Sequence, residues 1–157
     1  MAPTAHLRPA RPDEAGRLSA LALRSKAHWG YDDAFMAACV EELTLHPSEV
    51  VRRRTTVAEA TDGGSGRLLG LVTLEGAPPV GELGLMFVDP DAIGLGVGRL
   101  LFDHMQDTAR EAGFRAVSWA ADPNAVPFYE AMGGRHTGVI PSGSIPGRTL
   151  PLMELRL

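Results

Sequence analysis

The sequence predicts an α/β fold of the α+β kind, in which a mixed, mostly antiparallel sheet of six to seven strands carries helices on both faces. Apolar runs of strand length alternate with stretches of helical period, in the order β, α, α, β, β, β, α, β, α, β, β. Glycines and prolines separate these short elements. From residue 82, a strand, a glycine-rich turn, a helix and another strand follow in succession, which predicts one right-handed parallel crossover.

Seven runs have the length and composition of strands, and turn signals bound each of them. The glycine-rich segment 61–66 predicts a hairpin loop. The strand expected over residues 82–88 ends at Asp89-Pro90, because proline lacks the amide hydrogen that a sheet ladder needs. The strands are expected over residues 6–8, 55–60, 68–75, 82–88, 116–121, 135–140 and 150–157.

Four segments have helical period. Proline and acidic residues mark the first turn of the first helix, and Asp32 is suited to cap the second. Gly113 is suited to close the third, long helix. The helices are expected from Pro12 to Gly30, from Asp32 to Leu43, from Val97 to Gly113 and from Asn124 to Met132.

Length, composition and charge limit the classes of function. The chain of 157 residues suits one domain, residues 1–157, with one compact core. Its net charge of −4 argues against a nucleic-acid-binding protein, which usually presents a basic face. Cys39 is the only cysteine, which excludes an internal disulfide and a cysteine-rich zinc site. No apolar run approaches the ~20 residues that span a bilayer, so we expect a cytoplasmic protein that binds neither membrane nor metal.

The turn before the long helix is the most informative segment. Gly94, Gly96 and Gly98 stand at every second position. Without Cβ atoms they allow backbone amides to point into one concavity and a ligand to approach closely. The free N–H groups and the dipole of the following helix favour a phosphate group there. A tight strand-to-helix turn that binds nothing is the alternative.

Two common phosphate loops do not fit this turn. The Walker loop needs Lys and then Ser or Thr after its last glycine, whereas Arg99-Leu100 follows Gly98. The dinucleotide loop Gly-x-Gly-x-x-Gly fails at its third glycine, where Arg99 stands. Neither a P-loop protein nor a Rossmann protein is therefore expected.

Three blocks of sequence stand out together. They are Leu85-Met-Phe-Val-Asp-Pro90, Gly94-Leu-Gly-Val-Gly-Arg-Leu-Leu101 and Asn124-Ala-Val-Pro-Phe-Tyr-Glu-Ala-Met-Gly133. In this order they resemble the acyl-coenzyme A core of the GNAT superfamily of N-acetyltransferases. The predicted element order extends the resemblance over most of the chain. Residues 25–31 and 141–148 also resemble a bacterial subgroup of that family.

The resemblance implies acetyl-coenzyme A as cosubstrate, bound where the strand before the glycine turn separates from its neighbour. Backbone groups of Met86, Phe87 and Val88 would contact the pantetheine arm. A main-chain amide at the strand end would polarise the thioester carbonyl. The residues expected to hold the pyrophosphate through their amides are Gly94, Leu95, Gly96, Val97, Gly98 and Arg99.

Tyr129 matches the family tyrosine that protonates the departing thiolate. Its ordinary pKa of about 10 is close enough to that of a thiol for a proton to be shared as the C–S bond breaks. An aromatic anchor whose hydroxyl only finds a hydrogen bond is the alternative.

Two positions depart from the family pattern. Ile93 stands where the turn usually begins with Gln or Arg, so a side-chain contact to phosphate is lost while the backbone turn is kept. Asp122 stands seven residues before Tyr129, where the family commonly has asparagine. Asn124 either contacts the cofactor or caps the short helix.

The acceptor side is less sharply defined. An alkylamine is protonated near pH 7, so direct attack on the thioester needs a route for its proton. Glu82 stands where several GNAT proteins keep a carboxylate base, and a strand-end charge facing water is the alternative. His28, Trp29 and Tyr31 lie in the segment that helps to wall the acceptor pocket in GNAT folds. A histidine at a helix end is, however, more often structural than catalytic.

These features together predict an acetyl-coenzyme A-dependent N-acetyltransferase that moves an acetyl group to a primary amine by direct attack. The acceptor is a small-molecule or peptide amine that the sequence does not identify. The oligomeric state stays open, with a homodimer as one possibility. A non-catalytic acyl-coenzyme A binder or sensor, which kept the glycine turn without a competent base, is the competing class.

Overall fold

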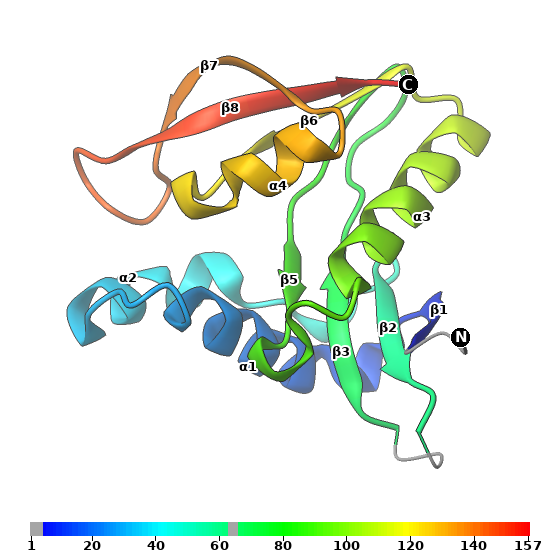
Figure 1. Cartoon of the computed structure of the whole chain (residues 1–157), viewed down its shortest axis with the longest axis horizontal. Helices are drawn as coiled ribbons and strands as arrows, with labels where there is room; N and C mark the ends of the chain where they lie inside the picture. The colour runs from blue at the N-terminus through cyan, green and yellow to red at the C-terminus, as the bar shows by residue number, and fades with distance from the viewer. Residues whose placement is uncertain (1–4, 63–65) are drawn as a thin grey trace.

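The computed structural model describes residues 5–62 and 66–157, which form two four-stranded sheets and four α-helices (Figure 1). The first sheet has the strand order β1-β2-β3-β5 and the second the order β4-β6-β8-β7. The strands are β1 (Ala5–Pro9), β2 (Thr56–Ala60), β3 (Leu68–Val72), β4 (Val80–Glu82), β5 (Met86–Val88), β6 (Ala116–Ala120), β7 (Arg135–Pro141) and β8 (Thr149–Arg156). The helices are α1 (Ala15–Ala27), α2 (Asp33–Leu43), α3 (Val97–Glu111) and α4 (Val126–Ala131).

The predicted fold class and order of elements are confirmed, but the strand count differs. Residues 82–88 were expected to form one strand and instead contribute to both sheets, so that the described residues form eight strands. β4 pairs in parallel with β6, as the predicted crossover requires, whereas β5 pairs antiparallel with β3. Residues 63–65 of the predicted hairpin loop lie outside the described residues, and the two strands that it joins, β2 and β3, do pair antiparallel.

The chain changes sheets within two residues. The Leu83 amide donates to the carbonyl of Ser118, a residue of β6, at 3.0 Å. The Leu85 amide donates to Oγ1 of Thr73, which directly follows β3, at 2.8 Å. Gly84 lies between them, and a Cβ there would collide with the Glu75 carboxylate. An apolar run reports that a strand is buried but not which neighbour it pairs with, so the division was not predicted.

Two hydrophobic cores lie on opposite faces of the first sheet. Because side chains alternate along a strand, Val57 joins the core under α1 and α2, and Ala58 joins the core under α3. Leu18 of α1 and Leu101 of α3 are both fully buried against these two faces. The second sheet adds Trp119 to the α3 core. This arrangement places the beginning of α3, the end of α1 and α4 around the point where the sheets part (Figure 1).

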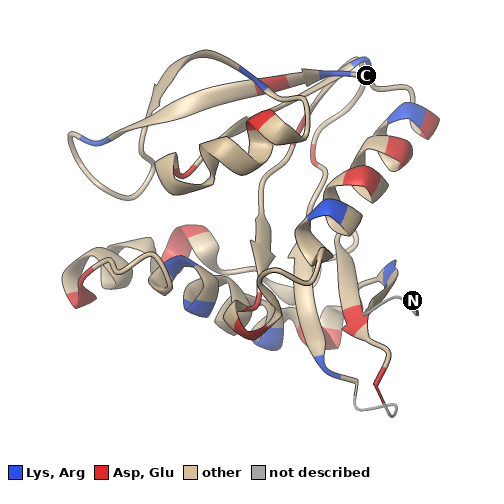
Figure 2. Cartoon of the chain, viewed as in Figure 1, with Lys and Arg blue, Asp and Glu red and all other residues tan. Residues whose placement is uncertain are grey.

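Local signals lie close to the helix ends, although α1 ends at Ala27, before Gly30, and α4 begins at Val126 rather than Asn124. Asp32 Oδ1 accepts a hydrogen bond from the Phe35 amide at 2.8 Å and caps α2. Gly30 and Gly113, which follow α1 and α3, have φ angles of +89° and +91° that glycine adopts without strain. Charged residues of both signs are spread over the helices and sheets (Figure 2). None of the described helices is long and apolar enough to cross a lipid bilayer.

A buried ion pair ties β1 to the turn before α1. The Arg8 guanidinium donates to both Glu14 carboxylate oxygens, at 2.9 and 2.7 Å, and also to Glu59 at 2.7 Å. The Arg11 amide donates to the same Glu14 carboxylate at 2.8 Å. The side chain of Glu14 is 2% exposed. Its hydrogen bonds with Arg8 outweigh the effect of burial and lower the pKa of Glu14 from 4.5 to about 2.

Candidate active site

A cavity of about 600 Å³ lies where the two sheets part. Its walls come from segments far apart in the sequence: the end of α1, one side of α2, the β4–β5 segment, the glycine turn, the end of β6 with α4, and the loop between β7 and β8. Residues predicted from the sequence to bind the cofactor and the acceptor therefore line one space. The cavity-lining members of the predicted site are Glu82, Met86, Phe87, Val88, Gly94, Gly96, Val97, Gly98, Arg99, Asn124, Tyr129, His28 and Trp29.

The strand edge of β5 is open on the cavity side. The ladder to β3 uses the Leu85 carbonyl, the register pair of Phe87 with Leu71, and the Asp89 amide. Because alternate residues of an antiparallel strand bond to opposite neighbours, the backbone groups of Met86 and Val88 point away from β3. Of the three residues predicted for the pantetheine arm, Met86 and Val88 therefore have backbone groups free to bind it. The backbone of Phe87 is used in pairing with β3, and this residue only lines the cavity.

The glycine turn presents unpaired amides at the start of α3. Gly94 and Gly96 have φ angles of +85° and +82°, and Gly96 is the N-cap of α3. The amides of Val97, Gly98 and Arg99 lie in the first turn of the helix, where no intrahelical acceptor exists. A Cβ at Gly98 would come within 3.3 Å of the Phe128 ring, so the absence of a side chain there also lets α4 pack close.

Leu95 does not belong to this wall. Its amide donates to the Ala92 carbonyl at 3.2 Å, and its side chain is exposed rather than part of the cavity lining. The prediction that Leu95 contributes an amide to the phosphate site is therefore not supported by the geometry. Sequence spacing placed it in the turn but could not tell which amides the turn uses internally.

Tyr129 lies on the cavity wall and is 7% exposed. Its ring packs 5.0 Å from the Trp119 ring and 5.3 Å from the Phe128 ring. Its hydroxyl has no hydrogen-bond partner among residues 5–62 and 66–157. Burial raises the pKa of this hydroxyl well above 10, and the negative charge of Asp122 raises it further. The hydroxyl thus stays protonated over the physiological range and is able to donate.

Two carboxylates near the point where the sheets part, Glu82 and Glu75, occupy different environments. Glu82 ends β4, is exposed, lines the cavity and has no side-chain partner within the described part of the chain. Glu75 instead accepts hydrogen bonds from Arg53 at 2.8 Å and Thr73 Oγ1 at 2.9 Å and does not line the cavity. The geometry therefore favours Glu82 over Glu75.

The three residues predicted for the acceptor pocket divide between two places. His28 and Trp29 line the cavity, and Trp29 is 47% exposed at its rim. Tyr31 stands behind the wall, where its ring stacks on Phe35 at 4.0 Å and its hydroxyl donates to Asp122 Oδ2 at 2.8 Å. Tyr31 is therefore a support of the cavity wall rather than a lining residue.

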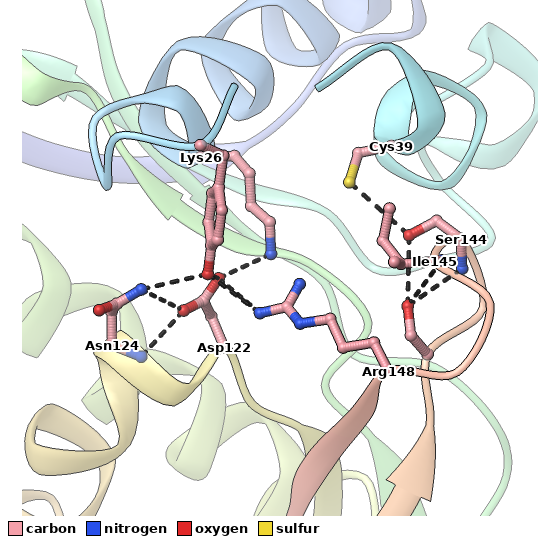
Figure 3. A network of polar contacts seen from close by, with 9 residues as sticks. Lys26, Cys39, Asp122, Asn124, Ser144, Ile145 and Arg148 are labelled. Atoms are coloured by element: carbon pink, nitrogen blue, oxygen red, sulfur yellow. Dashed lines mark hydrogen bonds and ion pairs between the residues drawn. The ribbon is translucent and has the colours of Figure 1, made fainter. Parts of the chain in front are cut away.

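Asp122 is the centre of a polar network that sequence analysis did not anticipate (Figure 3). Its Oδ2 accepts from Lys26 Nζ at 2.7 Å and from the Tyr31 hydroxyl. Its Oδ1 accepts from the amide and the side-chain nitrogen of Asn124, at 2.9 and 3.0 Å. Burial disfavours the charged form, but the bonds from Lys26 and Asn124 prevail, and the pKa of Asp122 is lowered.

This network decides the role of Asn124 in the short helical segment. Asp122, not Asn124, is the N-cap of the turn at residues 123–125. Asn124 Nδ2 donates instead to the Tyr31 hydroxyl at 3.1 Å. The alternative in which Asn124 caps the helix is therefore wrong, and its position on the cavity wall is compatible with a cofactor contact.

Further lining residues were not predicted as site residues. Lys26 and Arg148 line the cavity and lie within residues 25–31 and 141–148, the two segments that resemble a bacterial subgroup. That resemblance was the one feature of the sequence that could have pointed to them. Cys39 and Ser144 face each other across the cavity wall, with Sγ and Oγ 3.6 Å apart. Among the residues that the structure describes, no three potential metal ligands gather in one place.

Comparisons with known proteins place this geometry in a family. The chain is similar to a GCN5-related N-acetyltransferase structure from Rhodopseudomonas palustris, with TM-score 0.80, 23% identity, and 100% and 99% of the two chains covered. It is similar to the paiA N-acetyltransferase of Thermoplasma acidophilum, solved with coenzyme A, with TM-score 0.80, 16% identity and both chains fully covered. It is also similar to yncA of Salmonella typhimurium, solved with acetyl-CoA, with TM-score 0.67, 17% identity and 97% and 93% coverage.

These structural likenesses establish the fold, and the sequence itself establishes the family. No curated protein matches the chain at a significant level. The model of the acetyltransferase (GNAT) family matches residues 21–134, which is more than half of the chain and includes the β5 strand, the glycine turn and Tyr129. The chain therefore belongs to the GNAT acetyltransferase family.

Proposed function

We propose that this protein binds acetyl-coenzyme A and transfers the acetyl group to a primary amine by direct attack. The observation that carries this is that an open strand edge, the free amides of a helix start and a buried tyrosine all line one cavity. Family membership and the coenzyme complexes of paiA and yncA support the choice of cosubstrate.

The binding groups follow from the backbone geometry. The open edge at Met86 and Val88 would bond the pantetheine arm as a strand-like partner. The amides of Val97, Gly98 and Arg99, with the dipole of α3, would hold the pyrophosphate. The Met86 amide points away from β3 close to where the sheets part, and we assign it to the thioester oxygen.

The chemical step involves two proton transfers, one from the amine nitrogen and one to the departing sulfur. The amine nitrogen attacks the thioester carbon, a C–N bond forms and the C–S bond breaks. Glu82 would receive the proton that the nitrogen loses, and the Tyr129 hydroxyl would give a proton to the departing sulfur. The raised pKa of Tyr129 suits it to remain protonated until the thiolate forms.

Thiol release in the presence of acetyl-coenzyme A and a panel of amines tests this function. We expect amine-dependent release of free coenzyme A and an acetylated product of matching mass. Calorimetric titration with coenzyme A runs in parallel. Cofactor binding without turnover on any amine would favour the binder or sensor instead, and the lack of both would reject the cofactor site.

A further inference from the structure

Arg148 brings a positive charge into the acceptor side of the cavity. It lies near the end of the loop between β7 and β8, lines the cavity, and has a side chain that is only 20% exposed. Its guanidinium packs over the rings of Phe35, at 4.8 Å, and Tyr31, at 5.2 Å. One terminal nitrogen donates to the Tyr31 hydroxyl at 3.0 Å. The side chain is thereby held in one orientation, and its ion pair with Asp122 is long, at 3.9 Å.

The carboxylate that faces Arg148, that of Asp122, already accepts hydrogen bonds from other residues at both oxygens. Asp122 Oδ2 is 3.9 Å from the Arg148 nitrogen, beyond hydrogen-bond distance, and the same oxygen accepts the shorter bonds from Lys26 and Tyr31. Its other oxygen is taken by Asn124. Figure 3 shows Lys26 and Arg148 approaching Asp122 from different sides. One negative charge therefore faces two positive charges, which leaves an excess of one positive charge at this wall.

A largely buried guanidinium with unused donors favours an anionic partner. The Nε and Nη1 atoms of Arg148 have no partner within the described segments, and the desolvation of a charge is costly unless it is paired. The guanidinium fork matches a carboxylate in shape and charge. An acceptor that brings a carboxylate to this point would complete the interaction.

Apart from Arg99, which the proposed function assigns to the pyrophosphate, two negative charges on the other walls specify the rest of the acceptor. Glu42 of α2 and Glu82 of β4 also line the cavity and have no ion-pair partner in the parts of the chain described. Their negative charges attract an ammonium group and disfavour a doubly charged phosphate. A cavity with an excess positive charge on one wall and negatively charged carboxylates on others is complementary to a zwitterion.

We infer that the acceptor of this enzyme is an amino-carboxylate, and that Arg148 binds its carboxylate while the amine is presented for acetylation. This specifies the substrate class of the proposed acetyl transfer and presupposes that transfer. The carboxylate belongs either to a free amino acid or to the end of a short peptide, and both present the same group to Arg148.

Matched acceptors test the inference directly. Each amino acid is compared with its C-terminal amide and with the amine that lacks the carboxyl group, and dipeptides with their amides, using thiol release. We expect kcat/KM to be at least about tenfold higher for the carboxylate, as about 1.4 kcal/mol of selective binding gives. Free amino acids and dipeptides separate the two sources of the carboxylate.

The variant Arg148→Gln tests the residue, and Arg52→Gln is its control. Arg52 is 70% exposed, pairs with Glu49 at 3.3 Å and does not line the cavity. We expect Arg148→Gln to lower kcat/KM for the carboxylates at least about tenfold more than for the simple amines, which abolishes the preference. Arg148→Lys should restore part of the preference. The control should behave as wild type.

Two results would overturn the inference. Turnover of simple amines and amino acids with equal kcat/KM would do so while leaving the acetyltransfer function intact. An equal loss for all acceptors in Arg148→Gln would show that the residue only supports the wall. If no acceptor turns over, calorimetry of N-acetylglycine against N-acetylglycinamide on coenzyme A-loaded protein decides, because equal affinity rejects a carboxylate site. A missing coenzyme A signal instead counts against the proposed function.

Discussion

At the scale of single residues, the environment of Tyr129 matters more than its identity. The ring is held between Trp119 and Phe128, and burial together with Asp122 raises the pKa of the hydroxyl. The sequence supplied the position through its distance from the glycine turn. It did not reveal that the hydroxyl lacks a hydrogen-bond partner among the described residues, which is the feature that suits a proton donor.

Tyr129→Phe removes the hydroxyl and keeps the ring. We expect kcat to fall by about 100-fold, the usual scale for a general acid, while the affinity for coenzyme A changes by less than about twofold. Because its pKa is raised, the wild-type enzyme should show no loss of this acid below pH 10. Steady-state kinetics across pH and calorimetry check both points, and unchanged turnover in the variant would reject the acid role.

The Arg8–Glu14 pair makes stability depend on pH. Glu14 has a pKa of about 2 in the folded chain against 4.5 ordinarily, so the folded state favours its charged form by about 3 kcal/mol. This contribution is complete above pH 4.5 and is lost as the pH falls toward 2.

Glu14→Gln should remove this dependence. We expect the free energy of unfolding at pH 7 to fall by about 3 kcal/mol, and the difference from wild type to shrink between pH 4.5 and 2. Asp13→Asn is the control, since its side chain is 78% exposed and should change stability by less than about 0.5 kcal/mol. Urea unfolding at several pH values measures both. A difference that is independent of pH would contradict the assignment.

At the scale of elements, the glycine turn and α3 form one unit. Gly96 is the N-cap of α3 at a φ of +82°, and nothing lies within 4 Å of where its Cβ would be. A side chain at this position therefore meets open space but forces the backbone into an unfavourable region or out of the turn.

Gly96→Val is compared with Gly66→Val. Gly66 also has a positive φ, +67°, with open space around its Cβ position, and does not line the cavity. Both variants should lose about 1–2 kcal/mol of stability from left-handed strain. Only Gly96→Val should also weaken coenzyme A binding, by at least about tenfold. Equal affinities in the two variants would show that the turn does not hold the cofactor.

The β4–β5 segment shows why strand propensity was easier to predict than strand boundaries and pairing. Residues 82–88 are apolar enough for a strand, but the structure has two short strands instead, Val80–Glu82 and Met86–Val88. Leu83 bonds to Ser118 and Leu85 bonds to Thr73, and both partners belong to segments that packing brings beside these two strands. The opening between the sheets follows from these competing partners and not from any local propensity.

At the scale of the whole molecule, Asp122 joins the two halves. It connects the end of β6 in the second sheet with Lys26 of α1 and with Tyr31 beyond it. The Asp122 side chain is 11% exposed and that of Lys26 12%, so removing either partner leaves a charge in a poorly solvated place.

Asp122→Ala should therefore lower the free energy of unfolding by about 3 kcal/mol. The double variant with Lys26→Met should lose less than the sum of the two single changes, with a coupling of about 1–3 kcal/mol. Asp107→Ala is the control, because its side chain is 73% exposed and 3.5 Å from Arg110. Guanidinium unfolding supplies the free energies, and additive effects would show that the pair contributes no coupling.

By itself, the sequence determined the order of helices and strands, the cap at Asp32, the glycine turn and the family. These depend on periodicity and on backbone freedom, which act over a few residues. Only the tertiary structure decided the division of residues 82–88 between two sheets, the exclusion of Leu95 from the cavity, and the meeting of Lys26, Asp122 and Arg148. Lys26 and Asp122 are 96 positions apart, and their pairing follows from how α1 and the second sheet come together, since ionic contacts require proximity that only packing provides.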